Sequence, residues 1–202
     1  MSSDDIIGLY ERRALEWVGD RGRRTHFFEK GWLDRFTAMV PAGGAILDLG
    51  CGPAKPMAAY LIAQGFDVCG VDSSPTMISL ANANFPDQQW IVADMRTLAL
   101  GKAFAGVMSW DSFFHLNHND QRRMFPIFRA LAAAGAPLLF TSGPRHGEAI
   151  GNLHGEPLYH ASLAPDEYRS LLAANDFSVV AEQMEDLECG GHSVWLARRN
   201  ED

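Results

Sequence analysis

The sequence has few cysteines, no long apolar run and no excess of basic residues. Three cysteines with no signal peptide ahead of them do not indicate a disulfide framework. No apolar run approaches the length of a membrane-spanning helix, and the N-terminus is polar and acidic rather than a targeting segment. We therefore expect a cytoplasmic protein that does not act at a membrane.

The balance of charge is acidic, with 17 Lys and Arg against 25 Asp and Glu and a formal net charge of −8. Nucleic-acid binding depends largely on Lys and Arg that neutralise phosphates, so this balance argues against a nucleic-acid partner. The one basic cluster contains Arg21, Arg23 and Arg24. We interpret it as a solvated polar connection, and a grip on an anionic substrate is the alternative.

A chain of 202 residues is long enough for a single domain with its own core. Short apolar runs alternate with helical patterns over residues 42–142, which predicts a parallel sheet with helices on both faces. Two C-terminal apolar stretches, 177–181 and 192–197, fit an antiparallel hairpin. Within the domain we expect an N-terminal helical cap (1–41), a cofactor-binding core (42–142), a substrate loop (143–163) and a C-terminal helix with the hairpin (164–202).

Three further expectations concern the segments around this core. Apolar residues recur at helical spacing over residues 6–17 and 28–40, which predicts two amphipathic helices packed on the sheet. The segment 142–161 is rich in Gly, Pro and His without periodicity, so it is predicted to be a long functional loop. A helix is expected over residues 119–134, closed by Gly135, with Pro126 kinking it or displacing its start.

The most informative stretch is the apolar run 46–49, which contains Asp48 and leads into a turn with Gly50 and Gly52. Glycine lets the backbone approach a ligand closely and adopt positive φ. A helix is expected to start at Pro56, and its N-terminus would add unpaired N–H groups facing the same place. The turn therefore predicts a site for a nucleotide-like cofactor.

Two further acids follow apolar runs in the same way. Asp72 ends the run 67–71, and Asp94 follows the run 90–93. The carboxyl ends of parallel strands meet at one edge of the sheet, and open α/β sheets bind ligands at that edge. Three consecutive strands are thus predicted to bring carboxylates to one site.

These three segments resemble the first three motifs of the class I S-adenosylmethionine-dependent methyltransferases, as Asp48–Ala54, Val71–Ser74 and Ala93–Arg96. The resemblance implies a Rossmann-like, doubly wound α/β fold with a seven-stranded, mostly parallel sheet and a terminal antiparallel β-hairpin. It also implies S-adenosyl-L-methionine as the cofactor and methyl transfer to an O or N nucleophile of a small molecule. Ala54 departs from the pattern, because many members carry a third glycine there, but one added methyl group should not abolish the site.

The resemblance implies a role for each acid at this edge. Asp48 would attract the ammonium group of the cofactor, and Gly50 and Gly52 would let the backbone approach its amino-acid end. Asp72 would bind the two ribose hydroxyls, and Asp94 the adenine amino group. The other residues expected to line the cofactor site are Cys51, Ser73, Met77, Met95, Trp110 and, from the N-terminal helix, Tyr10.

The first candidate for chemistry is His115, which follows the fourth expected strand, where this family places side chains beside the methyl group. It would act as a base or substrate ligand, and a histidine that braces the loop explains its position equally well. His160 and Tyr159 are the next candidates for contact with substrate. The His and Glu residues of this region form no compact ligand set, so no metal is expected.

Two other functions share parts of the pattern. An NAD(P)-dependent oxidoreductase would have the glycine turn and an acid after the second strand, but Asp48, Asp94 and the terminal hairpin argue against it. A cofactor-binding protein without turnover, which acts by recognising a partner, would carry the same cofactor residues. The sequence leaves the methyl acceptor and the oligomeric state open.

Overall fold

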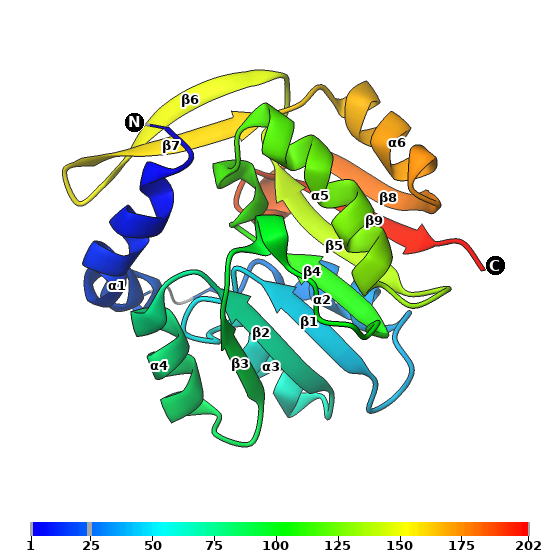
Figure 1. Cartoon of the computed structure of the whole chain (residues 1–202), viewed down its shortest axis with the longest axis horizontal. Coiled ribbons are helices and arrows are strands. Elements are labelled where there is room, and N and C mark those ends of the chain that lie inside the picture. The colour runs from blue at the N-terminus through cyan, green and yellow to red at the C-terminus, as the bar shows by residue number, and fades with distance from the viewer. Residues whose placement is uncertain (1, 24–25, 202) are drawn as a thin grey trace.

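The structure is a computed structural model that describes residues 2–23 and 26–201, so Arg24 of the basic cluster lies outside the described residues. The chain forms a seven-stranded sheet of order β3-β2-β1-β4-β5-β9-β8 and a separate two-stranded sheet, β6-β7 (Figure 1). The strands of the large sheet are β1 (Ala45–Leu49), β2 (Asp67–Asp72), β3 (Gln89–Val92), β4 (Gly106–Ser109), β5 (Pro137–Ser142), β8 (Phe177–Asp186) and β9 (His192–Arg199). The helices are α1 (Asp5–Gly22), α2 (Lys30–Thr37), α3 (Met57–Ala63), α4 (Pro75–Asn84), α5 (His118–Leu131) and α6 (Pro165–Ala174).

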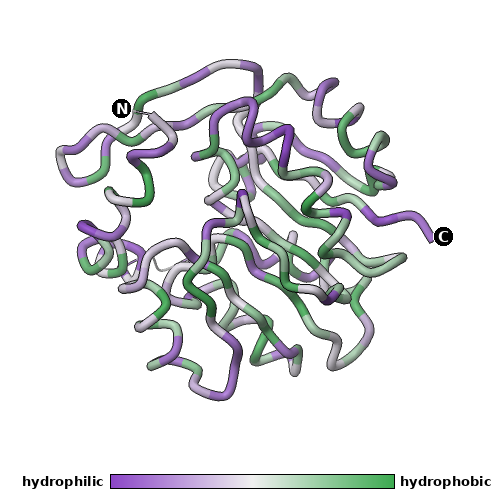
Figure 2. Tube along the Cα trace, viewed as in Figure 1, coloured by the Kyte–Doolittle hydropathy of each residue, from purple (hydrophilic) through white to green (hydrophobic). Residues whose placement is uncertain are grey.

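The sheet confirms the expected fold class. Strands β1 to β5 pair in parallel, and β9 lies antiparallel between β5 and β8. Strands β4 and β5 are buried along their whole length, which explains why their sequences are nearly continuous apolar runs. One apolar cluster lies under α5 and α6 and the other under α2 and α3, on the opposite face, so the sheet is doubly wound (Figures 1 and 2).

The helix after β2 begins as the sequence predicts. Ser74 has extended backbone angles, and its hydroxyl oxygen accepts a hydrogen bond from the Met77 amide at 3.1 Å. Pro75 occupies the first helical position, where its missing N–H costs nothing. This cap fixes α4 directly behind Asp72, the acid that ends β2.

The sequence pattern predicted that both N-terminal helices pack on the sheet, and for α1 this prediction is wrong. Only α2 does so, through Trp32 and Phe36. Helix α1 instead crosses the carboxyl edge of the strands and contacts α4 and β7 (Glu156–Ser162) (Figure 1). Its buried apolar face is small and consists of Ile6, Leu9 and Ala14, so it covers a narrow strip and leaves much of the helix to polar contacts.

The segment 142–161 is not a long loop. It forms an antiparallel hairpin of β6 (Gly147–Leu153) and β7, with a turn in which His154 and Gly155 adopt positive φ. The five central residues of β6 are exposed, so this strand has no alternation of apolar and polar residues that a sequence pattern could reveal. Figure 2 shows the hairpin as a stretch of mixed hydropathy that stands apart from the large sheet.

Helix α5 also differs from the prediction. It begins at His118, capped by the side chain of Asn117, and runs through Pro126 to Leu131, so the proline does not displace its start. Ala132 then leaves the helix, because it pairs as a β-bridge with Phe104. Gly135 therefore lies in the turn that leads to β5, with φ of 75°, and does not close the helix.

Candidate functional site

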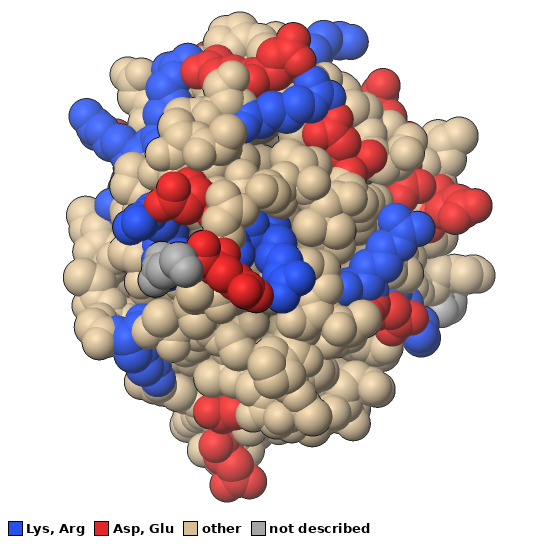
Figure 3. Space-filling view, turned by 90° about the vertical axis from the view of Figure 1, so that its right-hand side faces the viewer, with Lys and Arg blue, Asp and Glu red and all other residues tan. Residues whose placement is uncertain are grey.

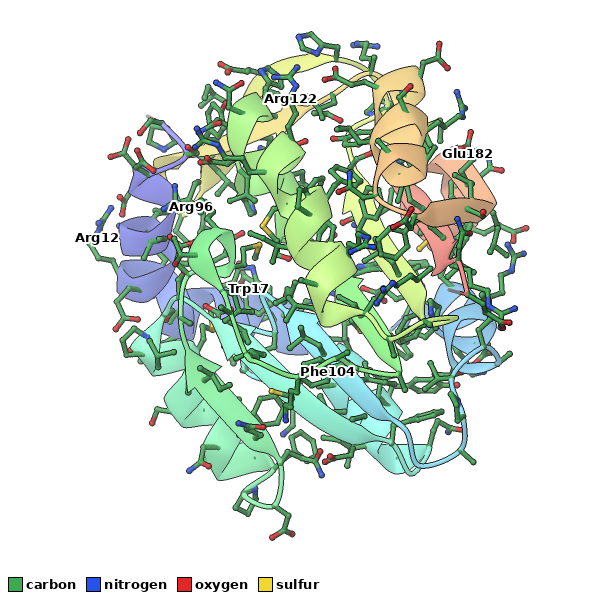
Figure 4. All side chains as sticks on the ribbon, turned by 45° about the vertical axis from the view of Figure 1, so that its right-hand side comes forward. Arg12, Trp17, Arg96, Phe104, Arg122 and Glu182 are labelled. Carbon is green, nitrogen blue, oxygen red and sulfur yellow. The ribbon has the colours of Figure 1, made fainter. Side chains whose placement is uncertain are left out.

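A cavity opens at the carboxyl edge of β1 to β4 and is covered by α1. In Figure 4 the side chain of Trp17 lies on the inner side of α1 and Arg12 on its outer side. The structure brings every predicted cofactor residue to this cavity: Tyr10, Asp48, Gly50, Cys51, Gly52, Asp72, Ser73, Met77, Asp94, Met95 and Trp110.

Four adjacent strands, β3, β2, β1 and β4, each bring an aspartate to the cavity: Asp94, Asp72, Asp48 and Asp111. Sequence reasoning assigned roles to the first three and none to Asp111. The signal was available, because Asp111 follows the apolar run of β4 just as Asp94 follows that of β3.

Asp48 is a buried acid without a donor. Its side chain is 2% exposed, and none of the described residues donates a hydrogen bond to its carboxylate. Burial and then the nearby charge of Asp72 raise its pKa to about 7. A buried carboxylate in this state is stabilised by a cation, so the site favours a ligand with a positive group at Asp48.

Asp72 is held in a fixed orientation at the end of β2. Its two carboxylate oxygens each accept a backbone hydrogen bond at 2.9 Å, one from Gly52 and one from Ser74. Burial raises its pKa, and the two amides oppose that shift. Each oxygen keeps a second lone pair, so this carboxylate can accept hydrogen bonds from two neighbouring hydroxyl groups.

The glycine turn approaches the loop after β4 closely. Gly50 has φ of 78°, and a Cβ atom there would lie 2.2 Å from the Cβ of Ser112. Ala54, at the position of the third glycine in the pattern, also adopts positive φ, at 65°, which costs a non-glycine residue roughly 1–2 kcal/mol.

Three amides of the glycine turn itself are bonded, whereas the expectation of unpaired N–H groups concerns the start of the following helix, α3. The amides of Gly50 and Cys51 both donate to the Val71 carbonyl, at 2.7 and 3.1 Å, and that of Gly52 donates to Asp72. These three N–H groups are therefore not available to hold a phosphate, and the acids beside them would repel one.

Asp94 has a role in the turn and in an ion-pair network. Its side chain accepts the Arg96 amide at 2.9 Å and forms a salt bridge with the Arg96 guanidinium at 2.7 Å. The same guanidinium contacts Asp4 at 2.6 Å, which links the edge of the sheet to the start of α1 (Figure 4). Asp94 still lines the cavity, so these contacts in the turn are compatible with its expected role as a ligand to the cofactor.

His115 lines the cavity with both ring nitrogens engaged. Its Nδ1 lies 2.8 Å from the Tyr159 carbonyl, and its Nε2 lies 2.9 Å from the Tyr10 hydroxyl. A carbonyl can only accept, so we assign the proton to Nδ1, and Nε2 then accepts from Tyr10. Burial lowers the pKa of His115 to about 4, so the ring is neutral. These contacts are the ones that a bracing residue would make.

The other two catalytic candidates lie elsewhere. Tyr159 is buried against α1, and its hydroxyl donates a hydrogen bond to Glu148 at 2.7 Å. It lines neither the cavity described above nor the one that contains His160. His160 lines a second cavity, between the β6-β7 hairpin and the turn that joins β8 to β9. Its ring centroid is 4.8 Å from that of His115, so the two cavities adjoin there.

A charged group that sequence reasoning missed connects the two cavities. Oδ1 of Asp111 forms a close ion pair with Nε2 of His192 at 2.8 Å, and Oδ2 lies 3.8 Å from Arg21. His192 also donates from Nδ1 to the Cys189 carbonyl at 2.6 Å, so both of its nitrogens face acceptors. The contact with Asp111 and the Cys189 carbonyl raise the pKa of His192 to about 10, and the ring is cationic at neutral pH.

Arg21 corrects the interpretation of the basic cluster as a solvated connection. Its side chain is 11% exposed, lines the first cavity and contacts Glu29 at 2.5 Å. Arg23 fits the solvated interpretation, because it is exposed and pairs with Asp20. No sequence signal pointed to His192, because only the antiparallel pairing of β9 with β8 and β5 brings it to this edge.

The described part of the chain has neither a metal-binding cluster nor a membrane-spanning helix. Among residues 2–23 and 26–201, no cluster of three or more His, Cys, Asp and Glu side chains is arranged to hold a metal ion. None of the helices in the same ranges is long and apolar enough to cross a membrane.

The chain is similar to known proteins at the level of sequence. Residues 46–135 match the methyltransferase domain family. A putative methyltransferase of Bacillus subtilis, YqeM, is 35% identical over 116 residues, which are 54% of this chain and 46% of that protein. The chain thus spans about half the length of the curated relative it matches.

Solved structures show the same fold over most of the chain. An amino pentose methyltransferase of Micromonospora echinaspora, with bound S-adenosylmethionine, has a TM-score of 0.72 at 20% identity, over 92% of this chain and 97% of that one. A 1,6-didemethyltoxoflavin-N1-methyltransferase of Burkholderia thailandensis has a TM-score of 0.72 at 18% identity (98% and 87% covered). Magnesium protoporphyrin IX methyltransferase of Synechocystis has a TM-score of 0.68 at 17% identity (97% and 98% covered).

The matched segment contains the strands and the glycine turn on which the resemblance rests, and the fold extends to the terminal hairpin. Residues 46–135 match the methyltransferase domain family, and the chain shares the fold of these solved methyltransferases.

Proposed function

We propose that the protein is a cytoplasmic S-adenosylmethionine-dependent methyltransferase that acts on an O or N nucleophile of a small molecule. The observation that carries the proposal is the buried, donorless carboxylate of Asp48 in the same cavity as the fixed carboxylate of Asp72. S-Adenosylmethionine has an ammonium group for the first and a ribose diol for the second. In the sheet, β3 lies beyond β2 as seen from β1, so Asp94 follows the strand next to that of Asp72, which supports a contact of Asp94 with the adenine.

The residues present fit this cofactor better than a dinucleotide. A dinucleotide site holds a pyrophosphate against the backbone of the glycine turn and the helix N-terminus behind it. Here the amides of Gly50, Cys51 and Gly52 are already bonded, and two acids with raised pKa values lie beside them. Negative charge at this turn favours a cationic cofactor and opposes a pyrophosphate.

When bound, S-adenosylmethionine supplies an electrophilic methyl group for in-line attack by the acceptor. The acceptor lone pair forms the new bond to carbon, the electron pair of the broken C–S bond stays on sulfur, and the acceptor proton leaves to water or to a base. The chain contributes mainly by position: α1 covers the cavity, and the Tyr10–His115 contact closes it beside Asp111. Orientation of this kind supplies up to roughly 7–11 kcal/mol in well-aligned intramolecular reactions.

The role of His115 follows from its contacts. The nitrogen that could accept a proton is occupied by Tyr10, so we propose that His115 braces the loop after β4 and positions Tyr10. His160 remains a candidate for contact with the acceptor, because it faces the second cavity. Tyr159 has a supporting role, because its carbonyl accepts from His115 and its side chain packs against α1.

A small acceptor suits both the charge and the neighbours. The neighbours with the same fold act on an amino pentose, a toxoflavin precursor and a porphyrin by their names. In the view of Figure 3, acidic and basic side chains are interspersed and form no continuous basic surface for nucleic acid.

Thermal shift with three cofactors tests the proposal. S-Adenosylhomocysteine should raise the melting temperature, because at 100 times its Kd a ligand adds about 2.7 kcal/mol to the free energy of unfolding. NADH and NADPH should leave the melting temperature unchanged. Stabilisation by a dinucleotide alone would overturn the proposal. Tight S-adenosylhomocysteine binding with no methylation of any acceptor in a broad panel would instead favour a cofactor-binding protein without turnover.

A further inference from the structure

The second cavity adjoins the first on the side of β4 and β5. Its floor includes Ser142 and Gly143, which end β5, and its wall includes His192, whose partner Asp111 lines the first cavity. If the first cavity holds the cofactor, an acceptor in the second reaches the methyl group past Asp111. The inference below therefore rests on the proposed function.

The walls of this cavity are rings and glycines. Phe114, His146 and His160 contribute flat side chains, and Gly190 and Gly191 on the opposite side leave room between them. Phe114 and His160 already pack at a centroid distance of 5.3 Å, tilted by 41°. Flat side chains of this kind favour a planar ligand, because rings stack at such distances.

The charges of the cavity are biased towards the positive, although the chain carries a net charge of −8. Glu148 accepts a hydrogen bond from Tyr159 and lies 3.9 Å from His118, so it is partly satisfied. His192 is cationic and bound to Asp111. Arg145 forms no ion pair or hydrogen bond with the other described residues, so it is the unmatched charge at this cavity.

We propose that this second cavity is the acceptor site and that it takes a planar aromatic or heteroaromatic acid, whose anionic group pairs with Arg145 while its ring lies among Phe114, His146 and His160. Its nucleophile then faces the Asp111–His192 pair at the junction of the two cavities. A planar amine lacks the partner for Arg145 and adds a second cation beside His192. A neutral ester of the same acid keeps the ring contacts and loses the ion pair.

Three matched probes test this by calorimetry on the full chain: 4-hydroxybenzoate, its methyl ester and 4-hydroxybenzylamine, each with and without saturating S-adenosylhomocysteine. The acid should bind at least about tenfold tighter than the ester, and the amine more weakly than either. Arg145→Gln should remove most of the preference for the acid and leave the affinity for the ester unchanged. Arg123→Gln is the matched control, because Arg123 is exposed on α5 and lines neither cavity.

Several results would overturn the inference. They are equal or tighter binding of the amine, no binding of the acid at millimolar concentration, or an unchanged acid preference in Arg145→Gln. The proposed function is separate, because it is decided by S-adenosylhomocysteine binding and by methylation, and neither result enters the comparison of acid, ester and amine. The probes are measured without that ligand as well, so the acid preference is decided in either case.

Discussion

The Tyr10 hydroxyl and the Nε2 atom of His115 lie 2.9 Å apart and join α1 to the loop after β4 across the cofactor cavity. The contact continues through Nδ1 of His115 to the Tyr159 carbonyl in β7. One neutral imidazole thus connects three segments that are far apart in the sequence. Since α1 has a small apolar face, polar contacts such as these hold it over the cavity, together with those of Glu11 to α4 and of Arg13 to Glu156.

His115→Ala should lower stability and cofactor affinity together. The substitution leaves the Tyr10 hydroxyl and the Tyr159 carbonyl without their partner, which costs about 1–3 kcal/mol for each buried polar group. Thermal unfolding and S-adenosylhomocysteine titration measure the two effects. A loss of turnover of 10²–10⁴-fold with intact cofactor affinity would instead identify His115 as a general base.

Tyr10→Phe separates the hydroxyl from the ring in the same assay. Tyr10→Phe should reproduce the part of the stability loss that comes from the contact with Nε2 of His115. The double variant should lose less stability than the sum of the two single variants, because both single changes remove the same interaction. Strict additivity in this double-mutant cycle would contradict the coupling of Tyr10 and His115.

Cofactor affinity should fall as the pH is lowered through 7. Asp48 must be ionised to pair with the ammonium group, and in the free protein burial raises its pKa to about 7. Below that pH a proton competes with the ligand, so the Kd for S-adenosylhomocysteine should rise roughly tenfold per pH unit. Titration calorimetry from pH 5.5 to 8.5 measures this slope, and Asp48→Asn should bind weakly with no such slope.

The free Asp48→Asn variant should be more stable than the parent protein at pH 8. An acid whose pKa is higher in the folded than in the unfolded state loses stability as pH rises towards its folded value, here about 7. Removing that ionisation should raise the free energy of unfolding by on the order of 1–3 kcal/mol. Each kcal/mol corresponds to a rise in Tm of about 2–4 °C. The gain should vanish near pH 4, where both proteins are neutral at this position, and a constant difference across this range would contradict the shift.

His192 should stay protonated well above neutral pH. Its pKa is raised to about 10 by Asp111 and the Cys189 carbonyl, so this pair contributes stability that is present below the ordinary histidine value and is lost as pH rises through 10. NMR titration of the imidazole C–H signals measures the value directly. Asp111→Asn should return the pKa towards 6.5, and a titration of His192 near 6.5 in the parent protein would rule the ion pair out.

Gly50→Ala should be much more harmful than Gly43→Ala, although both glycines have φ between 70° and 80°. A Cβ at Gly50 would lie 2.2 Å from Ser112, whereas a Cβ at Gly43 would meet no atom within 4 Å. The control should cost roughly 1–2 kcal/mol from backbone conformation alone, and Gly50→Ala a further 1–3 kcal/mol from overpacking. Chemical denaturation compares the two, and equal losses would show that Ser112 moves aside freely.

The local sequence determined the sheet and the cofactor edge of this protein. Asp48 lies near the end of a short apolar run, and Asp72 and Asp94 each follow one. Such runs form parallel strands whose ends meet, so the convergence of these acids could be predicted from local patterns. The cap of α4 by Ser74 and Pro75 is equally local. These features depend on residues within a few positions of one another.

Only the tertiary structure decided what closes and connects the site. Arg21 and Asp111 are 90 positions apart, and His192 comes from the last strand, so no local pattern could place their charges together. In the β6-β7 hairpin β6 is mostly exposed, and the hairpin is stabilised by the pairing of its strands and by the packing of Tyr159 and Ala161 of β7 against α1. Hydrophobic periodicity in a sequence indicates which face of an element is buried. The contacts of Arg21, Asp111 and His192 are ion pairs between distant segments, and such contacts produce no periodic pattern in the sequence.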